Sequence, residues 1–214
     1  MEMPDVTAVA SDPGLLQALE RAKRLGFTGP GDTADHILHA LRFVPVALEA
    51  FSSTGIGRGV DLGSGAGLPG LVLAVAFPLT TWVLVDSMER RTSALEQAVR
   101  NLDLGDRVQV LLGRAESVAR DPAHRNAAAL VTARSFGPPA AAAECGAPLL
   151  LPQGLLAVSE PPGSSGERWP AAPLTELGLE PMGVRDGIMV CRSTHPTPDS
   201  YPRKVGIPSK RPLF

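Results

Sequence analysis

The chain has 214 residues, of which 44% are apolar and 20% charged; this is ordinary usage for a globular protein and excludes wholesale disorder. Its 20 basic and 22 acidic residues give a net charge of −2, so any contact with nucleic acid must come from a local basic patch. Aromatic residues make up 4% of the chain, too few for a surface that stacks successive RNA bases.

The cysteines and the N-terminal segment bear on the cellular setting. Cys145 and Cys191 belong to no Cys-x-x-Cys pair, so we expect two reduced core thiols and no metal site. The N-terminal segment lacks a basic start followed by an apolar run. The longest apolar stretch, residues 71–77, is too short to cross a bilayer. We therefore expect a cytoplasmic protein with no membrane segment.

Helical spacing marks the N-terminal quarter of the chain. After a cap at Asp12, apolar residues recur with a helical period until Gly26. A second helical face begins at Ile37, with a kink expected at Pro45. We predict a helical extension over residues 1–55.

From Gly59 the pattern changes to short apolar runs that alternate with helical ones, as in parallel βαβ units. The predicted strands cover residues 59–62, 81–86, 107–112, 128–133 and 155–159. Between them, helices are predicted at residues 68–76, 88–102 and 139–150. The sequence predicts an α/β fold with an open, mostly parallel, doubly wound sheet.

The remaining C-terminal segments are expected to complete this domain. Residues 160–173 are predicted as a loop, and residues 174–184 and 187–193 as an antiparallel pair at the sheet edge. We assign the main domain to residues 56–195. Residues 196–214 form a basic, proline-rich tail.

The strongest chemical signal is the glycine-rich segment Asp61-Leu62-Gly63-Ser64-Gly65-Ala66-Gly67-Leu68-Pro69-Gly70, which leaves the first strand and enters a helix. Glycines let the backbone approach a ligand and adopt positive φ, and a helix N-terminus offers free N–H groups. Asp86, at the end of the second strand, is placed to accept hydrogen bonds from a ribose diol. These features predict a cofactor that contains a ribose.

Two cofactors fit the glycine-rich segment. The spacing Gly65-x-Gly67-x-x-Gly70, with Asp86 following, satisfies the dinucleotide fingerprint. In the frame Asp61-x-Gly63-x-Gly65-x-Gly67, an acid precedes the glycines, which suits the ammonium group of S-adenosylmethionine. Beside a pyrophosphate the same acid would repel the ligand, so the residues favour the methyl donor.

Several motifs occur together in an order that resembles a known family. They are DLGSGAGLPG at 61–70, LVDSMERR at 84–91, GRAES at 113–117, TARSF at 132–136 and YPRKVGIPSKRPL at 201–213. The chain resembles the guanine-N7 methyltransferases of small-subunit ribosomal RNA, also called glucose-inhibited division protein B. The resemblance implies a Rossmann-like class I methyltransferase fold with S-adenosylmethionine as cofactor.

Carried over by motif position, the resemblance also implies roles for single residues. Gly63 and Leu68 would line the methionine end, Asp86 would face the ribose, Ala115 and Glu116 would meet the adenine, and Arg134 would lie at the cofactor site. Asp61, Gly65 and Gly67 complete the predicted cofactor-binding set.

Ribosomal RNA or the small ribosomal subunit is the expected partner. Candidate phosphate contacts are Arg90, Arg91, Arg203, Lys204, Lys210 and Arg211, although a solvated helix face and a solubilising tail would give the same pattern. Two segments depart from the family. His39-Ala40 stands where members usually have Asp-Ser, and Ser159-Glu160 replaces Lys-Gly.

The residues after the fourth predicted strand reduce the number of methylation reactions that fit the sequence. The turn Gly137-Pro138-Pro139-Ala140 lacks the polar residue and aromatic ring used in amine methylation. Pyrimidine C5 methylation needs a cysteine nucleophile near that turn, and Cys145 lies inside the next predicted helix. Guanine N7 has a lone pair and no proton to lose, so its methylation needs alignment rather than a general base. We therefore predict no catalytic side chain.

Two alternatives stay open from the sequence. One is a divergent relative that binds S-adenosylmethionine but methylates a small molecule or nothing. The other is an NAD-dependent oxidoreductase, for which the sequence offers no hydride-transfer partner.

Overall fold

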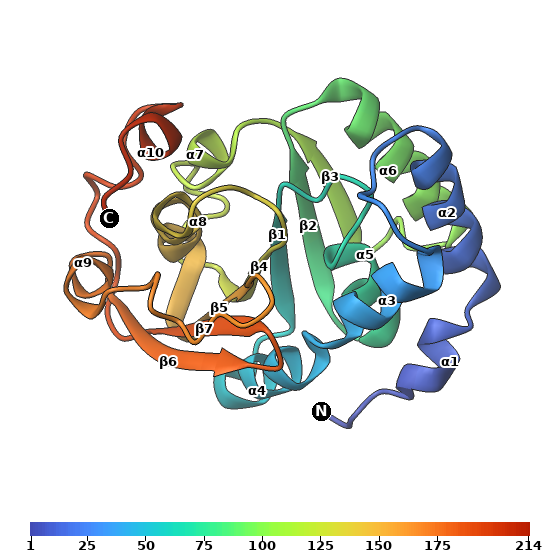
Figure 1. Ribbon diagram of the computed structural model, residues 1–214, viewed down its shortest axis with the longest axis horizontal. Helices are drawn as coiled ribbons and strands as arrows, with labels where there is room; N and C mark the ends of the chain where they lie inside the picture. The colour runs from blue at the N-terminus through green and yellow to red at the C-terminus, as the bar shows by residue number, and fades with distance from the viewer.

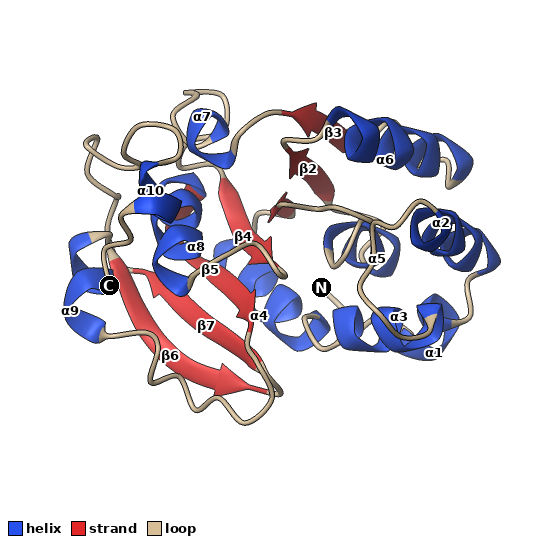
Figure 2. Cartoon of the chain, turned by 45° about the horizontal axis from the view of Figure 1, so that its top comes forward, coloured by secondary structure: helices blue, strands red, loops and turns tan.

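A single mixed sheet with helices on both faces forms the centre of the computed structural model, which describes residues 1–214 (Figure 1, Figure 2). Its strands are β1 Arg58–Leu62, β2 Thr81–Asp86, β3 Val108–Leu112, β4 Ala128–Ala133, β5 Leu150–Ser159, β6 Leu179–Arg185 and β7 Ile188–Ser193. They are ordered β3-β2-β1-β4-β5-β7-β6, and only β7 runs antiparallel to its neighbours β5 and β6. The predicted doubly wound sheet with an antiparallel edge pair is confirmed.

Helices cover both faces of this sheet. They are α1 Val6–Ala10, α2 Pro13–Arg24, α3 Thr33–Leu41, α4 Val44–Thr54, α5 Gly70–Ala76, α6 Glu89–Asn101, α7 Ala115–Val118, α8 Pro139–Gly146, α9 Ala171–Glu176 and α10 Ile207–Lys210, with a 3-10 turn at Ala147–Leu149. One apolar core joins α1 to α6 with one sheet face, and a second joins α7, α8 and α9 with the other. No helix is long and apolar enough to span a membrane.

The central strands are buried on both faces, as a sheet covered twice requires. All residues of β4 are buried, and β1 and β2 each expose or half-expose only their first residue. Such strands read in sequence as continuous apolar runs. This is why the sequence located them closely.

The N-terminal helices differ in detail from the prediction. An unpredicted helix, α1, is capped by Asp5, whose carboxylate accepts hydrogen bonds from the N–H groups of Thr7 and Ala8 at 3.0 and 3.1 Å. The kink expected at Pro45 is instead a break between α3 and α4, with Pro45 in the first turn of α4. Proline is tolerated there because a first-turn N–H has no partner inside the helix.

The C-terminal half carries three further corrections. The helix predicted at 139–150 ends at Gly146, and β5 already begins at Leu150. The edge strand predicted at 174–184 begins only at Leu179, because α9 occupies the preceding residues. The tail also contains the short helix α10, which lies beside α8.

Candidate active site

The candidate site lies where β1, β2 and β4 end. The chain passes from β1 outward to β2 and β3, and β4 then pairs with the other side of β1, so the strand order reverses between β1 and β4. Ligands of open α/β sheets bind at the carboxyl ends of the strands beside such a reversal. The glycine-rich loop of residues 63–69 joins β1 to α5 at this place.

Asp61 holds the glycine-rich loop from inside the protein. It is fully buried, and its Oδ2 accepts a hydrogen bond from the N–H of Gly70 at 3.1 Å. Its Oδ1 accepts a second from the hydroxyl of Thr132 at 2.7 Å. The carboxylate thus ties the start of α5 to β4. It lines neither cavity of the site, so its contact with an ammonium group stays a prediction.

Asp86 holds the opposite side of the same loop. Its Oδ2 accepts a hydrogen bond from the N–H of Gly65, and its Oδ1 accepts one from the N–H of Met88, each at 2.9 Å. Carboxylate oxygens have further lone pairs, so both bonds leave acceptor capacity for a ribose diol.

Two cavities meet at Gly63. The larger, about 180 Å³, is lined by residues that include Phe27, Gly29, His36, Gly65, Leu68, Arg91 and Arg134. The smaller, about 50 Å³, is lined by residues that include Asp86, Ala115, Glu116, Phe136, Cys145 and Ser209. Gly63 borders both cavities. The structure thus brings together Gly63, Gly65, Leu68, Asp86, Ala115, Glu116 and Arg134 from separate sequence motifs.

Arg134 is fixed in the larger cavity by α3. Its Nη2 donates a hydrogen bond to Nδ1 of His36 at 2.9 Å, and its Nη1 donates one to the His36 carbonyl at 3.3 Å. With Nδ1 accepting, the ring proton lies on Nε2, which donates to the carbonyl of Gly29 at 3.1 Å. Burial lowers the pKa of Arg134, and the nearby Asp61 opposes this shift.

Glu116 connects the smaller cavity to the C-terminal tail. It is buried, and its Oε1 accepts a hydrogen bond from the N–H of Gly206 at 2.8 Å. Arg114 lies 3.5 Å from the same oxygen. The tail therefore lies against the smaller cavity, beside the residues that are predicted to contact the adenine. Ser209 of the tail is part of the lining of this cavity.

The other predicted residues lie in different surroundings. Gly67 lines neither cavity and has φ +97°, and an added Cβ would come within 2.9 Å of Leu71. Arg91 borders the larger cavity, 3.7 Å from Asp86. Arg203 is bound to the buried Glu144. Arg90, Lys204, Lys210 and Arg211 are exposed.

Phe27, His36 and Ser209 line the cavities but are not among the site residues predicted from the sequence. Nothing local in the sequence of residues 27–32 shows that this segment faces the glycine-rich loop. The family motif in the tail, by contrast, was a signal that could have pointed to Ser209.

We expect the stability of the fold to depend on pH through the buried carboxyl of Asp61. Burial raises the pKa of its carboxyl from 3.8 to about 6, while the hydrogen bond from Thr132 opposes the shift. Between these values the folded protein holds the proton more tightly than the unfolded chain, so stability falls as pH rises from about 4 to 6. Two pKa units correspond to about 3 kcal/mol.

Urea unfolding of wild type and Asp61→Asn across this pH range measures the effect. We expect the variant to lack this part of the pH dependence, because an amide does not ionise, and it can accept from the Gly70 N–H through its oxygen and donate to the Thr132 hydroxyl through its NH2 group. Parallel stability curves for the two proteins would show that the buried carboxyl does not titrate in this range.

The fold is Rossmann-like, and the candidate cofactor site lies at the switch point of its sheet. Solved methyltransferases share this fold. An O-methyltransferase from Bacillus cereus in complex with SAH aligns with a TM-score of 0.62 at 11% identity, covering 86% of this chain and 92% of that chain. A methyltransferase from Geobacter sulfurreducens aligns with a TM-score of 0.58 at 15% identity, covering 86% and 90%.

Sequence comparison identifies the family. Residues 19–159 match the family model described as rRNA small subunit methyltransferase G. The ribosomal RNA small subunit methyltransferase G of Symbiobacterium thermophilum is 32% identical over an alignment of 233 positions, which covers 96% of this chain and 93% of the relative. The methyltransferase G of Prochlorococcus marinus is 38% identical over an alignment of 168 positions, which covers 73% of this chain and 68% of the relative. The chain belongs to this family, and it is an S-adenosylmethionine-dependent methyltransferase.

Proposed function

We propose that the protein transfers a methyl group from S-adenosylmethionine to N7 of a guanine in small-subunit ribosomal RNA. The observation that carries the proposal is the family match over residues 19–159 together with relatives named for the small-subunit RNA. The surroundings of the site support the finer assignment to N7.

The residues of the two cavities fit the cofactor. Asp86 has acceptor capacity for the ribose hydroxyls, and it lines the smaller cavity together with Ala115 and Glu116. Arg91 and Arg134 bring positive charge to the larger cavity, where the carboxylate of the methionine part would be neutralised. Gly63, which borders both cavities, has no side chain that would separate them. When bound, the cofactor supplies a methyl group on a sulfonium sulfur.

A third cavity is the proposed entry for the guanine. It has a volume of about 390 Å³ and shares Arg134 and Ser135 with the larger cofactor cavity and Phe136 with the smaller one. The Phe136 ring offers a flat apolar face for a base. Three of the four residues that depart from the family pattern, His39, Ser159 and Glu160, line this cavity. The departures therefore lie on the proposed substrate side.

The groups around this cavity support methyl transfer by alignment. Burial lowers the pKa of His39 to about 4, with the charge of Arg134 as the second cause, so its imidazole is uncharged at neutral pH. Burial raises the pKa of the Cys145 thiol, which disfavours a cysteine nucleophile. N7 offers its lone pair directly to the methyl carbon and loses no proton, so the chain has only to bind, orient and exclude water.

Incubation with small ribosomal subunits lacking the modification and with labelled S-adenosylmethionine tests the proposal. Digestion of the RNA and chromatography of the nucleosides should place the label in 7-methylguanosine. Cys145→Ala should give the same product, because no covalent enzyme intermediate is formed. Label on an exocyclic amine or a pyrimidine carbon would contradict the mechanism, and cofactor binding without transfer to RNA would favour the divergent-relative alternative.

A further inference from the structure

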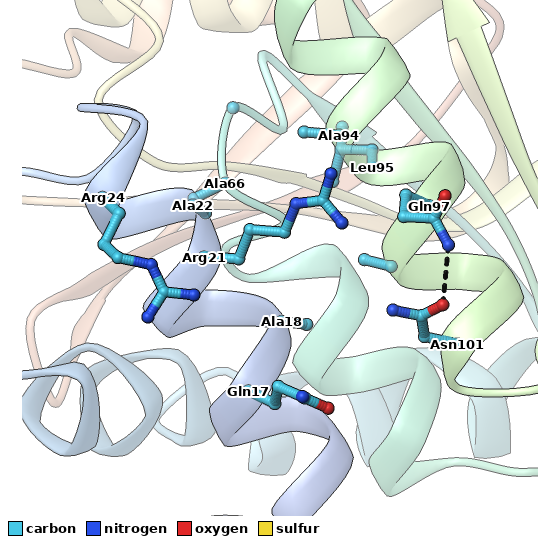
Figure 3. A pocket seen from close by; sticks show the side chains of 12 residues that line it. Gln17, Ala18, Arg21, Ala22, Arg24, Ala66, Ala94, Leu95, Gln97 and Asn101 are labelled. Atoms are coloured by element: carbon cyan, nitrogen blue, oxygen red, sulfur yellow. Dashed lines mark hydrogen bonds between the residues drawn. The ribbon is translucent and has the colours of Figure 1, made fainter.

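A groove between α2 and α6 opens next to the glycine-rich loop. It has a volume of about 430 Å³, and Gly65 and Ala66 form part of its lining. Gly65 and Ala66 also line the larger cofactor cavity, so the two spaces share a wall. Figure 3 shows the side chains that face this groove.

The two helices contribute different chemistry to the groove. Arg21 and Arg24 come from the last turn of α2, and in Figure 3 the Arg21 side chain reaches toward α6. From α6, the groove is lined by Gln97 and Asn101, whose amides are hydrogen-bonded to each other at 2.7 Å. Buried alanine and leucine side chains lie between these polar groups.

The two arginines differ from most basic residues of the chain because they have no partner. Lys23, in the same turn, lies 3.6 Å from Asp32, and Arg203 and Arg125 are held by carboxylates or carbonyls. Arg21 and Arg24 make no ion pair and no side-chain hydrogen bond. The dipole of α2 favours cations in its last turn, but it does not explain why two guanidinium groups border an open groove.

We propose that this groove holds the phosphodiester backbone of an RNA segment that flanks the target guanine, since the groove and the proposed guanine cavity both border the larger cofactor cavity and share no residue. This inference rests on the proposed function. Guanidinium groups bind phosphate oxygens with two parallel hydrogen bonds, and the amides of Gln97 and Asn101 can donate to or accept from sugar hydroxyls. The net charge of the chain is −2, so such local unpaired cations are what an RNA surface requires here.

Further exposed cations on the tail and at the start of α6 would extend this surface. Lys204, Lys210 and Arg211 are exposed on the tail, which is bound through Gly206 to Glu116 at the smaller cavity. Arg90 is exposed at the start of α6. RNA bound by the groove and by the tail would cross the carboxyl ends of the strands, where the cofactor is held.

The double variant Arg21→Gln/Arg24→Gln tests the groove. We expect KM for small ribosomal subunits to rise between about tenfold and a hundredfold, because each lost charge-assisted contact accounts for about a factor of ten. Affinity for S-adenosylhomocysteine, measured by calorimetry, should stay unchanged. The slope of log affinity for the RNA against log salt should fall by about one for each lost phosphate contact.

Arg185→Gln/Arg192→Gln is the matched control. It removes two positive charges that pair with Glu49, away from the groove. The inference is overturned if this control raises KM equally or if the groove variant leaves KM unchanged. It is also overturned if the groove variant lowers the affinity for S-adenosylhomocysteine instead. Failure of wild type to methylate any RNA would refute the proposed function itself, so the two failures are distinguishable.

Discussion

Replacement of Gly63 by valine is expected to abolish cofactor binding while the protein stays folded. Gly63 has φ +68°, and a Cβ added there would lie 2.8 Å from the Phe136 ring. Because Gly63 borders both cavities, the valine side chain would occupy the place where they meet. We expect affinity for S-adenosylhomocysteine to fall about a hundredfold or more, as for contacts misplaced by about 1 Å.

Gly55→Val is the matched control for this substitution. Gly55 ends α4 with φ +67°, and no atom lies within 4 Å of an added Cβ. Valine there imposes the same backbone strain at a distance from the cavities. Calorimetry should show binding by Gly55→Val and none by Gly63→Val. Equal loss in both variants would mean that backbone strain, rather than obstruction of the site, is responsible.

The second large effect is expected at the junction between the tail and α8. Glu144 is fully buried, and its carboxylate accepts hydrogen bonds from the backbone N–H, Nε and Nη2 of Arg203 at 2.6–2.8 Å. The same hydrogen bonds raise the pKa of Arg203. Arg203→Met would leave the buried carboxylate with only the backbone N–H. We expect the free energy of unfolding to fall by about 3 kcal/mol.

Urea unfolding of three variants separates the contribution of this pair. In Arg185→Met, an equally short ion pair of 2.6 Å is lost from a half-exposed position, and the expected change is at most about 1 kcal/mol. In Glu144→Gln/Arg203→Met, part of the lost stability should return because no charge remains buried. Similar losses in Arg203→Met and Arg185→Met would show that burial does not govern the strength of the Glu144 pair.

The sequence predicted those parts of the fold that local pattern determines. Apolar runs located β1, β2 and β4 because both faces of these strands are buried, and the glycines marked the loop after β1. The helix and strand ends that were predicted wrongly depend on residues that are distant in sequence and on the hydrogen bonds that cap helices. Residues 174–178 have an apolar pattern that suits either a strand or the turn of helix that the structure has there.

The sequence indicates candidate site residues by their chemical type, but it does not indicate their partners within the fold. The carboxylate of Asp61 is predicted to contact the ammonium group of the cofactor, and the structure adds that it binds Gly70 and Thr132 inside the fold. Arg203 is predicted as a phosphate contact, and the structure adds that it binds Glu144, 59 positions earlier. Contacts of such separation leave no local pattern in a single sequence, because the fold alone brings the two segments together.

A crystal structure of the protein with S-adenosylhomocysteine tests the account of the site most directly. We predict one ligand that passes Gly63, with its adenine in the smaller cavity beside Ala115, its ribose hydroxyls on Asp86 and its amino-acid end near Arg134. A ligand bound in the groove between α2 and α6, or one that leaves either of the two cavities without contact, would contradict the assignment.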